Sequence, residues 1–295
     1  MAGACLVVLT SCLPQLVPTY DPSSTATQRT AILTPDGSDA YAFVVGGGTL
    51  DAQGLGGNAG HNLRYAFWPS GVPVLADSQS CALWTSQDGG YAQQGAAFRI
   101  RRSSDGRMRA VTVTKNVVFG VNWGFNFHTW DTDRDIAFQQ FGGKVIPGLK
   151  GANGYAVPLP WHFCARAIGP TIEFKVWTTH MAEPAWGDPD WSGHAHIPDG
   201  FSAAGTTGWF AGHLQAGERM RFDDLRTWRY STTPPPIPTT TSTRPTPIRP
   251  PLVLVPPTTT TAPTTAAAPT SSSTTVAPAS PASPTRAVAG FGPNP

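Results

Sequence analysis

The sequence is poor in charged side chains, which make up 13% of its 295 residues, where about a quarter is usual. The formal net charge is only +2, and Arg99, Arg101 and Arg102 form the one notable basic cluster. A nucleic-acid-binding surface needs a strong basic patch, so the sequence predicts no nucleic acid as a partner. No run approaches the ~18 apolar residues of a membrane-spanning helix.

Glutamate is scarce as well, since the chain holds only Glu173, Glu183 and Glu218. Glycoside hydrolysis needs two carboxyl groups that flank the scissile bond, and these three residues do not form such a pair on one segment. The scarcity therefore counts against glycosidase activity.

Cysteine is limited to Cys5, Cys12, Cys81 and Cys164, and no Cys/His spacing resembles a zinc site. If the protein is exported, Cys81 and Cys164 are expected to form a disulfide across a long loop, because disulfides persist in oxidising compartments. The alternative is two buried free thiols.

Glycine (31), proline (30) and tryptophan (10) are abundant. From residue 40 to 230, short runs of alternating polarity are separated by Gly, Asp, Asn or Pro, with turn signals such as Asp105-Gly106, Gly142-Gly143 and Asn153-Gly154. Many short strands at fairly regular spacing predict a single all-β sandwich or barrel over residues 40–230. Residues 13–39 are interpreted as a polar, turn-rich lead-in.

The two ends of the chain have compositions of their own. The first residues, MAGACLVVLTSC, end in Leu9-Thr10-Ser11-Cys12, which resembles the bacterial lipobox and predicts lipidation at Cys12. No Lys or Arg precedes this short run, so a hydrophobic segment without targeting value is the alternative. Residues 231–295 are dominated by Thr, Pro, Ala and Ser, which predicts a disordered tail, either an O-glycosylated stalk or an unmodified spacer.

The most informative stretch is Thr112–Asp131, whose second half alternates with the period of a strand. One side would carry an aromatic core: Val121, Trp123, Phe125 and Phe127. The other would carry Asn122, Gly124, Asn126, His128 and Trp130. Amide, imidazole and indole groups around a glycine are typical of a sugar-binding face, and we expect Trp84 to join it.

Catalytic and metal-binding candidates near this strand are weak. His128 could act as a general base, and Asp131, Asp133 and Asp135 follow at alternate positions. A structural histidine and a solvated turn or calcium loop explain the same residues. Two further sets could hold a metal ion: Asp188, Asp190, His194 and His196 in one loop, and Asp223 with Asp224, where a structural calcium ion or hydrogen-bonded aspartates are the alternatives.

Several runs together resemble a known family. GTTGWFAGHLQAGERMRFDDLRTW resembles the closing hairpin of concanavalin A-like (laminin-G-like) jelly-roll domains. QQGAAFRIR, FNFHTWDT, LPWHFCAR and EPAWGDP are similar to domains of exported actinobacterial proteins and of minor tail proteins of actinobacteriophages. The resemblance covers residues 40–230 and implies a jelly-roll sandwich of two antiparallel sheets. That fold hosts lectins, carbohydrate-binding modules and enzymes alike, but the alternating Glu/Asp/Glu strand of its glycosidases is absent here.

The sequence thus predicts an extracellular or cell-envelope protein, with a lipid anchor as its only contact with a membrane. Its jelly roll is expected to bind a glycan or cell-wall polysaccharide without catalysis, and without any cofactor beyond a structural calcium ion. The alternatives are a polysaccharide lyase or hydrolase that uses His128 and the nearby aspartates, and a structural, adhesion or phage-tail protein.

Overall fold

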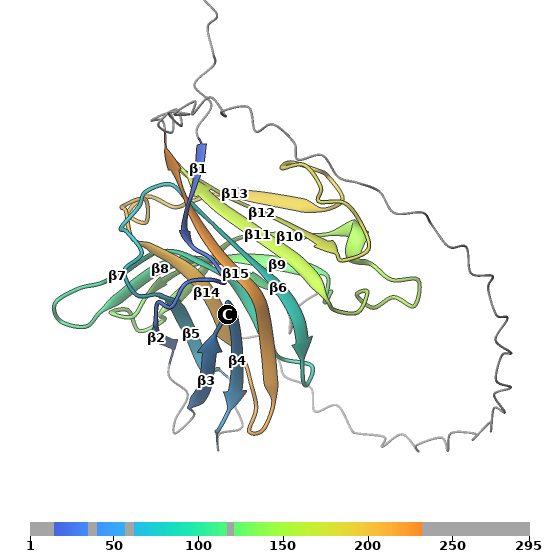
Figure 1. Ribbon diagram of the computed structural model, residues 1–295, viewed down its shortest axis with the longest axis horizontal. Helices are drawn as coiled ribbons and strands as arrows, with labels where there is room; N and C mark the ends of the chain where they lie inside the picture. The colour runs from blue at the N-terminus through green and yellow to red at the C-terminus, as the bar shows by residue number, and fades with distance from the viewer. Residues whose placement is uncertain (1–14, 35–39, 57–61, 117–120, 232–295) are drawn as a thin grey trace, which may run out of the picture. The chain divides into compact units, whose positions relative to one another are not determined.

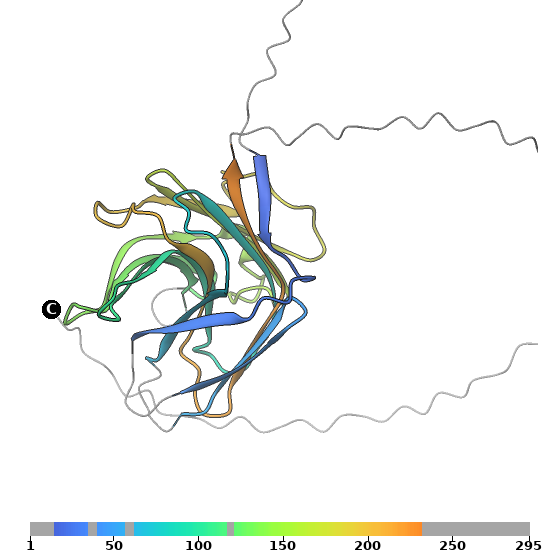
Figure 2. The same cartoon turned by 60° about the vertical axis from the view of Figure 1, so that its left-hand side comes forward.

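The computed structural model describes residues 15–34, 40–56, 62–116 and 121–231. These residues form two antiparallel β-sheets that pack face to face (Figure 1, Figure 2). The predicted all-β jelly-roll sandwich is confirmed, and the described residues contain one 3-10 turn, Pro147–Leu149, and no α-helix. Cys12, the rest of the predicted leader, and the tail from residue 232 onward lie outside the described residues. Within the described ranges, no helix is long and apolar enough to cross a membrane.

Sheet A comprises β1 (Gln15–Tyr20), β3 (Tyr41–Gly46), β4 (Thr49–Gly54), β6 (Ser78–Gln87), β11 (Trp161–Ile168), β12 (Thr171–Thr178), β13 (Ser192–His196) and β15 (Arg219–Ser231). Its order is β13-β12-β11-β6-β15-β4-β3, and β1 also pairs with β15. Sheet B comprises β2 (Gln28–Thr34), β5 (Arg64–Pro69), β7 (Gln93–Arg102), β8 (Met108–Lys115), β9 (Gly124–Asp131), β10 (Phe138–Val145) and β14 (Thr206–Gly212). Its order is β10-β9-β8-β7-β14-β5-β2.

Two local expectations need correction. The segment 13–39 is more than a lead-in, because β1 pairs with β15 and β2 pairs with β5. Ala31 and Leu33 of β2 alternate with exposed residues and are buried. Gly142 and Gly143, expected in a turn, instead lie inside β10.

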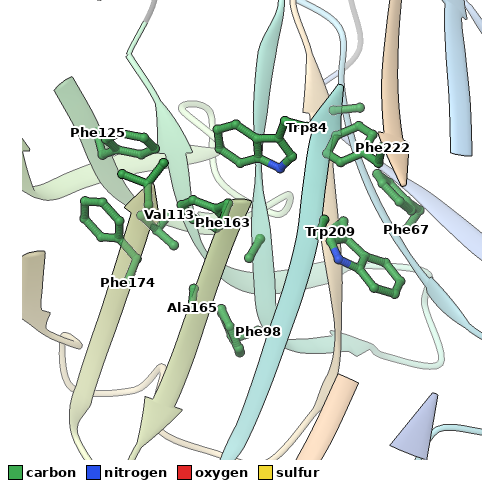
Figure 3. Packing of buried hydrophobic residues seen from close by; sticks show 14 of the residues in the cluster. Phe67, Trp84, Phe98, Val113, Phe125, Phe163, Ala165, Phe174, Trp209 and Phe222 are labelled. Carbon is green, nitrogen blue, oxygen red and sulfur yellow. The ribbon is translucent and has the colours of Figure 1, made fainter. Parts of the chain in front are cut away.

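The main core fills the space between the sheets and is rich in aromatic side chains (Figure 3). Trp84 of β6 stacks on Phe163 of β11 with ring centroids 4.4 Å apart. Across the interface, Phe125 of β9 lies 6.1 Å from the Trp84 ring. Each large side chain buried in this way stabilises the fold by about 2–3 kcal/mol.

A second apolar cluster covers the outer face of sheet B, the face that points away from sheet A. It combines small residues with large ones, namely Ala31, Leu33, Ala66, Trp68, Ala97, Ile100, Met108, Ala110, Trp130 and Phe210. Sheet B therefore buries apolar side chains on both of its faces.

The predicted disulfide between Cys81 and Cys164 is confirmed. The two residues lie directly opposite each other on β6 and β11. They are separated by 83 positions in the sequence, and closing a loop of that length corresponds to roughly 4–5 kcal/mol on the chain-entropy model. The bridge ties together two strands at the centre of sheet A.

Candidate functional site

Strand β9 has the alternation that the sequence predicts. Phe125 and Phe127 belong to the core between the sheets, while Trp130 belongs to the outer cluster and contacts the His128 ring at 5.7 Å. Asn126 is half-buried on the same outer side. Asn126, His128 and Trp130 therefore lie on the predicted side, whereas Asn122 lies in the turn before β9 and not on the strand.

Trp130 does not offer an open indole. It is 1% exposed, and its Nε1 donates a hydrogen bond to Oγ1 of Thr112 at 2.8 Å. The rings of Phe210 and Phe138 lie 5.7 and 5.6 Å away, and the Arg64 guanidinium lies 5.7 Å from the indole centroid. Because stacking on a sugar needs a free aromatic face, this burial argues against Trp130 as a sugar-binding residue.

Trp84 requires a correction. It lies on β6 of sheet A and not on the outer face of sheet B. Its side chain is fully buried between the sheets and stacks on Phe163. It is a core residue.

His128 lies between Thr112 on β8 and Gln140 on β10. Burial, together with the positive charge of Arg64, lowers the pKa of His128 to about 4. The ring is therefore neutral at pH 7 and only weakly basic, which makes it a poor general base near neutral pH. Its Nδ1 is buried and has no hydrogen-bond partner among the described residues.

The aspartates after β9 do not cooperate with His128. Alternation along the strand places Asp131 on the side opposite His128. Asp131 is buried and ion-paired with Arg109 at 3.0 Å and with Arg134 at 3.6 Å. Asp133 pairs with Arg107 at 2.8 Å. These carboxylates neutralise arginines, and the proposed catalytic set of His128 with Asp131 and Asp133 is not assembled.

The residues at Asp223 and Asp224 do not fit a calcium ion. Asp223 accepts from Arg221 at 3.0 Å, and Asp224 pairs with Arg226 at 2.8 Å. A calcium site instead needs six to eight oxygen ligands around one point. Both carboxylates are neutralised by arginine, in keeping with the structural alternative.

The loop before β13 does not gather a metal site either. Oδ1 of Asp188 accepts backbone N–H groups of Asp190 and Trp191, at 2.9 and 3.2 Å, which is the hydrogen bonding of a turn. His194 and His196 follow as exposed residues of β13. No group of three or more His, Cys, Asp or Glu side chains in the described part of the chain could hold a metal ion.

A cavity lies at the end of the sandwich where β6 and β8 end and β9 and β11 begin. Its volume is about 430 Å³. The side chains that define it are Ser86, Gln87, Lys115, Asn122, Pro158 and Trp161. Of the five predicted sugar-binding residues, Asn122 alone is among those that line this cavity.

Two amides in the cavity are oriented by hydrogen bonds. Oδ1 of Asn122 accepts from the backbone N–H of Ala156 at 2.9 Å. Oε1 of Gln87 accepts from Nζ of Lys115. Neither amide nitrogen has a further partner within the described part of the chain, so both remain available as donors.

Lys115 forms part of the cavity floor. Its side chain is buried, and its Nζ lies 5.8 Å from the centroid of the Trp161 ring. Burial lowers the pKa of Lys115 to about 7, so a large share of this amine is neutral at physiological pH. The cavity is therefore less cationic than the presence of a lysine would suggest.

Gln87, Lys115 and Trp161 line the cavity as well and are not among the residues predicted from the sequence. A signal existed for Lys115, because the alternation Val111, Val113, Lys115 places all three on the core side of β8. Trp161 carries no such signal, since its position at the open end of the sandwich depends on the pairing of β11 with β6.

No protein-family model and no curated protein matches this chain. Several solved structures are similar at low identity. The carbohydrate-binding module CBM66 from Bacillus subtilis is 11% identical, with 68% of this chain and 94% of that one covered and a TM-score of 0.37. The CBM2 module of the evolved Dit of Lactobacillus casei BL23 phage J-1 is 12% identical, with 74% and 97% covered and a TM-score of 0.39.

A protein of unknown function with a galectin-like fold from Bacillus subtilis is 8% identical to this chain. The alignment covers 74% of this chain and 99% of that one, with a TM-score of 0.45. The similarity of all three structures to this chain concerns the jelly-roll fold alone.

Proposed function

We propose that the protein binds a neutral glycan in the cavity at the end of the sandwich, without catalysis. One observation carries this proposal: a cavity of about 430 Å³ that combines oriented amides with an apolar wall. Small-ligand sites commonly measure about 300–1,000 Å³ and use a few fixed polar groups for orientation. The volume and the lining both fall within this description.

The chemistry of the lining suits sugar hydroxyl groups. The amide nitrogens of Asn122 and Gln87 can each donate, and the exposed Ser86 hydroxyl can donate or accept. Because the oxygens of both amides are already held by Ala156 and Lys115, binding would cost little additional ordering of these side chains. Pro158 supplies an exposed apolar surface against which a sugar ring could pack.

The same residues favour binding over hydrolysis. A glycosidase needs two carboxyl groups about 5–9.5 Å apart, and the described residues that line the cavity include no Asp or Glu. Outside the cavity, the Asp131 carboxylate is ion-paired with Arg109, and the lowered pKa of His128 makes its ring a weak base. Incubating bound oligosaccharides with the protein should therefore release no products.

The binding test uses two matched substitutions that separate the two candidate sites. Asn122→Asp keeps the oxygen that accepts from Ala156 but removes the amide donor, and should weaken binding about tenfold, the equivalent of one hydrogen bond. Asn126→Asp makes the same chemical change on the outer face of sheet B and should leave affinity unchanged. A glycan array would identify the probe, and calorimetry with that oligosaccharide would measure affinity.

The reverse result, a loss with Asn126→Asp alone, would move the site to the outer face. The absence of any binder on an array of neutral and acidic glycans would refute glycan binding altogether.

We further propose that the protein is exported to the cell envelope and anchored through Cys12. The Cys81–Cys164 bridge supports export, because disulfides persist in oxidising compartments. Metabolic labelling with palmitate in a bacterial host should label the full-length chain and not its Cys12→Ser variant. Equal labelling of the two, or none, would contradict the anchor.

A further inference from the structure

The end of β8 opposite the cavity carries a cluster of arginines. Pairing of β7 with β8 places Arg101 beside Arg109, and the connecting turn contributes Arg107. A second cavity, of about 240 Å³, lies there. We call its lining residues the arginine cluster: Arg101, Arg102, Ser103, Arg107 and Arg109.

The nearby carboxylates balance only part of this charge. Asp131 pairs with Arg109 at 3.0 Å, and Asp133 pairs with Arg107 at 2.8 Å. Asp105 accepts from the Ser103 hydroxyl and from the backbone N–H of Arg107, so its carboxylate is engaged in the hairpin turn.

Arg101 and Arg102 have no ion pair within the described residues. Nη2 of Arg101 reaches the carbonyl oxygen of Gly200 at 3.5 Å, at the limit of a hydrogen bond, and its Nε is buried without a hydrogen-bond partner there. Nε of Arg102 donates a hydrogen bond to the sulfur of Met108, at 3.4 Å. Leaving a guanidinium N–H unpaired away from water is costly, so this arrangement favours an acceptor from outside the chain.

The electrostatics agree with this geometry. Burial lowers the pKa of Arg101, the positive charges of Arg109 and Arg107 lower it further, and Asp131 acts in the opposite direction. The side chain therefore lies in a field that remains positive despite the neighbouring carboxylate.

We propose that the arginine cluster binds a tetrahedral oxoanion, a sulfate or phosphate group. The planar guanidinium offers parallel N–H donors that match two oxygens of such a group, and several arginines around one cavity can share its remaining oxygens. The group could be a free ion, a sulfate ester on a glycan or a phospholipid headgroup, which present the same atoms to the cluster.

This site is separate from the glycan cavity. Arg109 and Lys115 lie six positions apart on β8, which corresponds to about 20 Å along a strand. A single sugar residue cannot touch both, so either proposal can fail without the other.

The test measures binding of inorganic sulfate and phosphate to the full-length protein by calorimetry at low ionic strength. Wild type should show saturable binding, and Arg101→Gln should weaken it at least tenfold. Arg29→Gln removes one exposed arginine of β2 as a matched control and should leave affinity unchanged. If Arg101→Gln fails to fold, the exposed Arg102→Gln replaces it, with a loss of at least several-fold expected.

Arg101→Lys keeps the charge but removes the fork of donors, and should bind more weakly than wild type. Sulfated oligosaccharides and vesicles containing phosphatidylglycerol then identify the source by their dependence on Arg101, and binding of the free ions alone would identify a small anion as the ligand. The proposal is overturned by the absence of saturable anion binding, by an equal loss in Arg101→Gln and Arg29→Gln, or by full affinity in Arg101→Lys.

Discussion

Replacing Lys115 with methionine should stabilise the protein, and the gain should shrink as the pH rises. Lys115 is only 5% exposed, and burial lowers its pKa to about 7, whereas an unfolded lysine titrates near ~10.4. Between these two values the unfolded state holds a proton that the folded state has released. Stability of the wild type must therefore rise with pH across this window.

The size of the effect follows from the pKa difference. Below pH 7 both states are protonated, and burial of the ammonium costs the folded state about 5 kcal/mol relative to the neutral amine. At pH 9 the remaining cost is about 2 kcal/mol. Methionine has a similar length and no charge, but it loses the hydrogen bond to Gln87, which contributes about 1 kcal/mol. The expected gain is thus about 4 kcal/mol at pH 6 and about 1 kcal/mol at pH 9.

Urea unfolding under non-reducing conditions, followed by tryptophan fluorescence at both pH values, measures this difference. Lys150→Met removes an exposed ammonium and corrects for the general effect of losing a surface charge. A Lys115→Met gain that is the same at pH 6 and pH 9, or a destabilisation at both, would refute the reasoning, because the buried amine would then titrate as it does in the unfolded chain.

Two further predictions concern the disulfide and His128. Replacing Cys81 and Cys164 together with alanine should lower the free energy of unfolding by roughly 4 kcal/mol, and a reducing agent should destabilise wild type but not this variant; equal stability of the two proteins would contradict the bridge. His128 should stay neutral down to about pH 4, so acidification from about 6.5 to 4 protonates the unfolded state first and lowers stability by about 3 kcal/mol at most. An NMR titration of its ring protons with a midpoint near 6.5 would contradict this assignment.

Strand alternation identified much of the fold because it shows which side chains lie on the same side of a strand. The run FNFHTW placed Phe125 and Phe127 in the core and His128 and Trp130 on the other side, as observed. Glycine was harder to interpret. Gly142 lies inside β10 next to the Phe127 ring, where an added Cβ would come within 3.3 Å of that ring. A glycine at such a close approach inside a strand has the same sequence signature as one in a turn.

The candidate site was harder to predict from the sequence than the fold, because alternation shows on which side of a strand a residue lies but not what covers that side. Trp130 lies on the predicted face, yet Arg64 and Phe138 cover its indole from β5 and β10. Trp84 was expected on the same face as Trp130, but it lies on β6 of sheet A. The sequence alone does not show which strands share a sheet. Lys115 is predictable from the sequence, because its alternation with Val111 and Val113 puts it on the core side of β8.

The net charge of +2 also proved a weak guide to local charge. Arg101 and Arg102 form a short run in the sequence, and the β7–β8 hairpin adds Arg107 and Arg109 to it. At the other end of β8, burial removes much of the charge of Lys115. One strand thus links a nearly neutral cavity to a cationic one, and the two should respond differently to salt. Added salt screens a partly exposed guanidinium cluster but has little effect on hydrogen bonds between neutral groups, so ionic strength alone can separate ligands of the two sites.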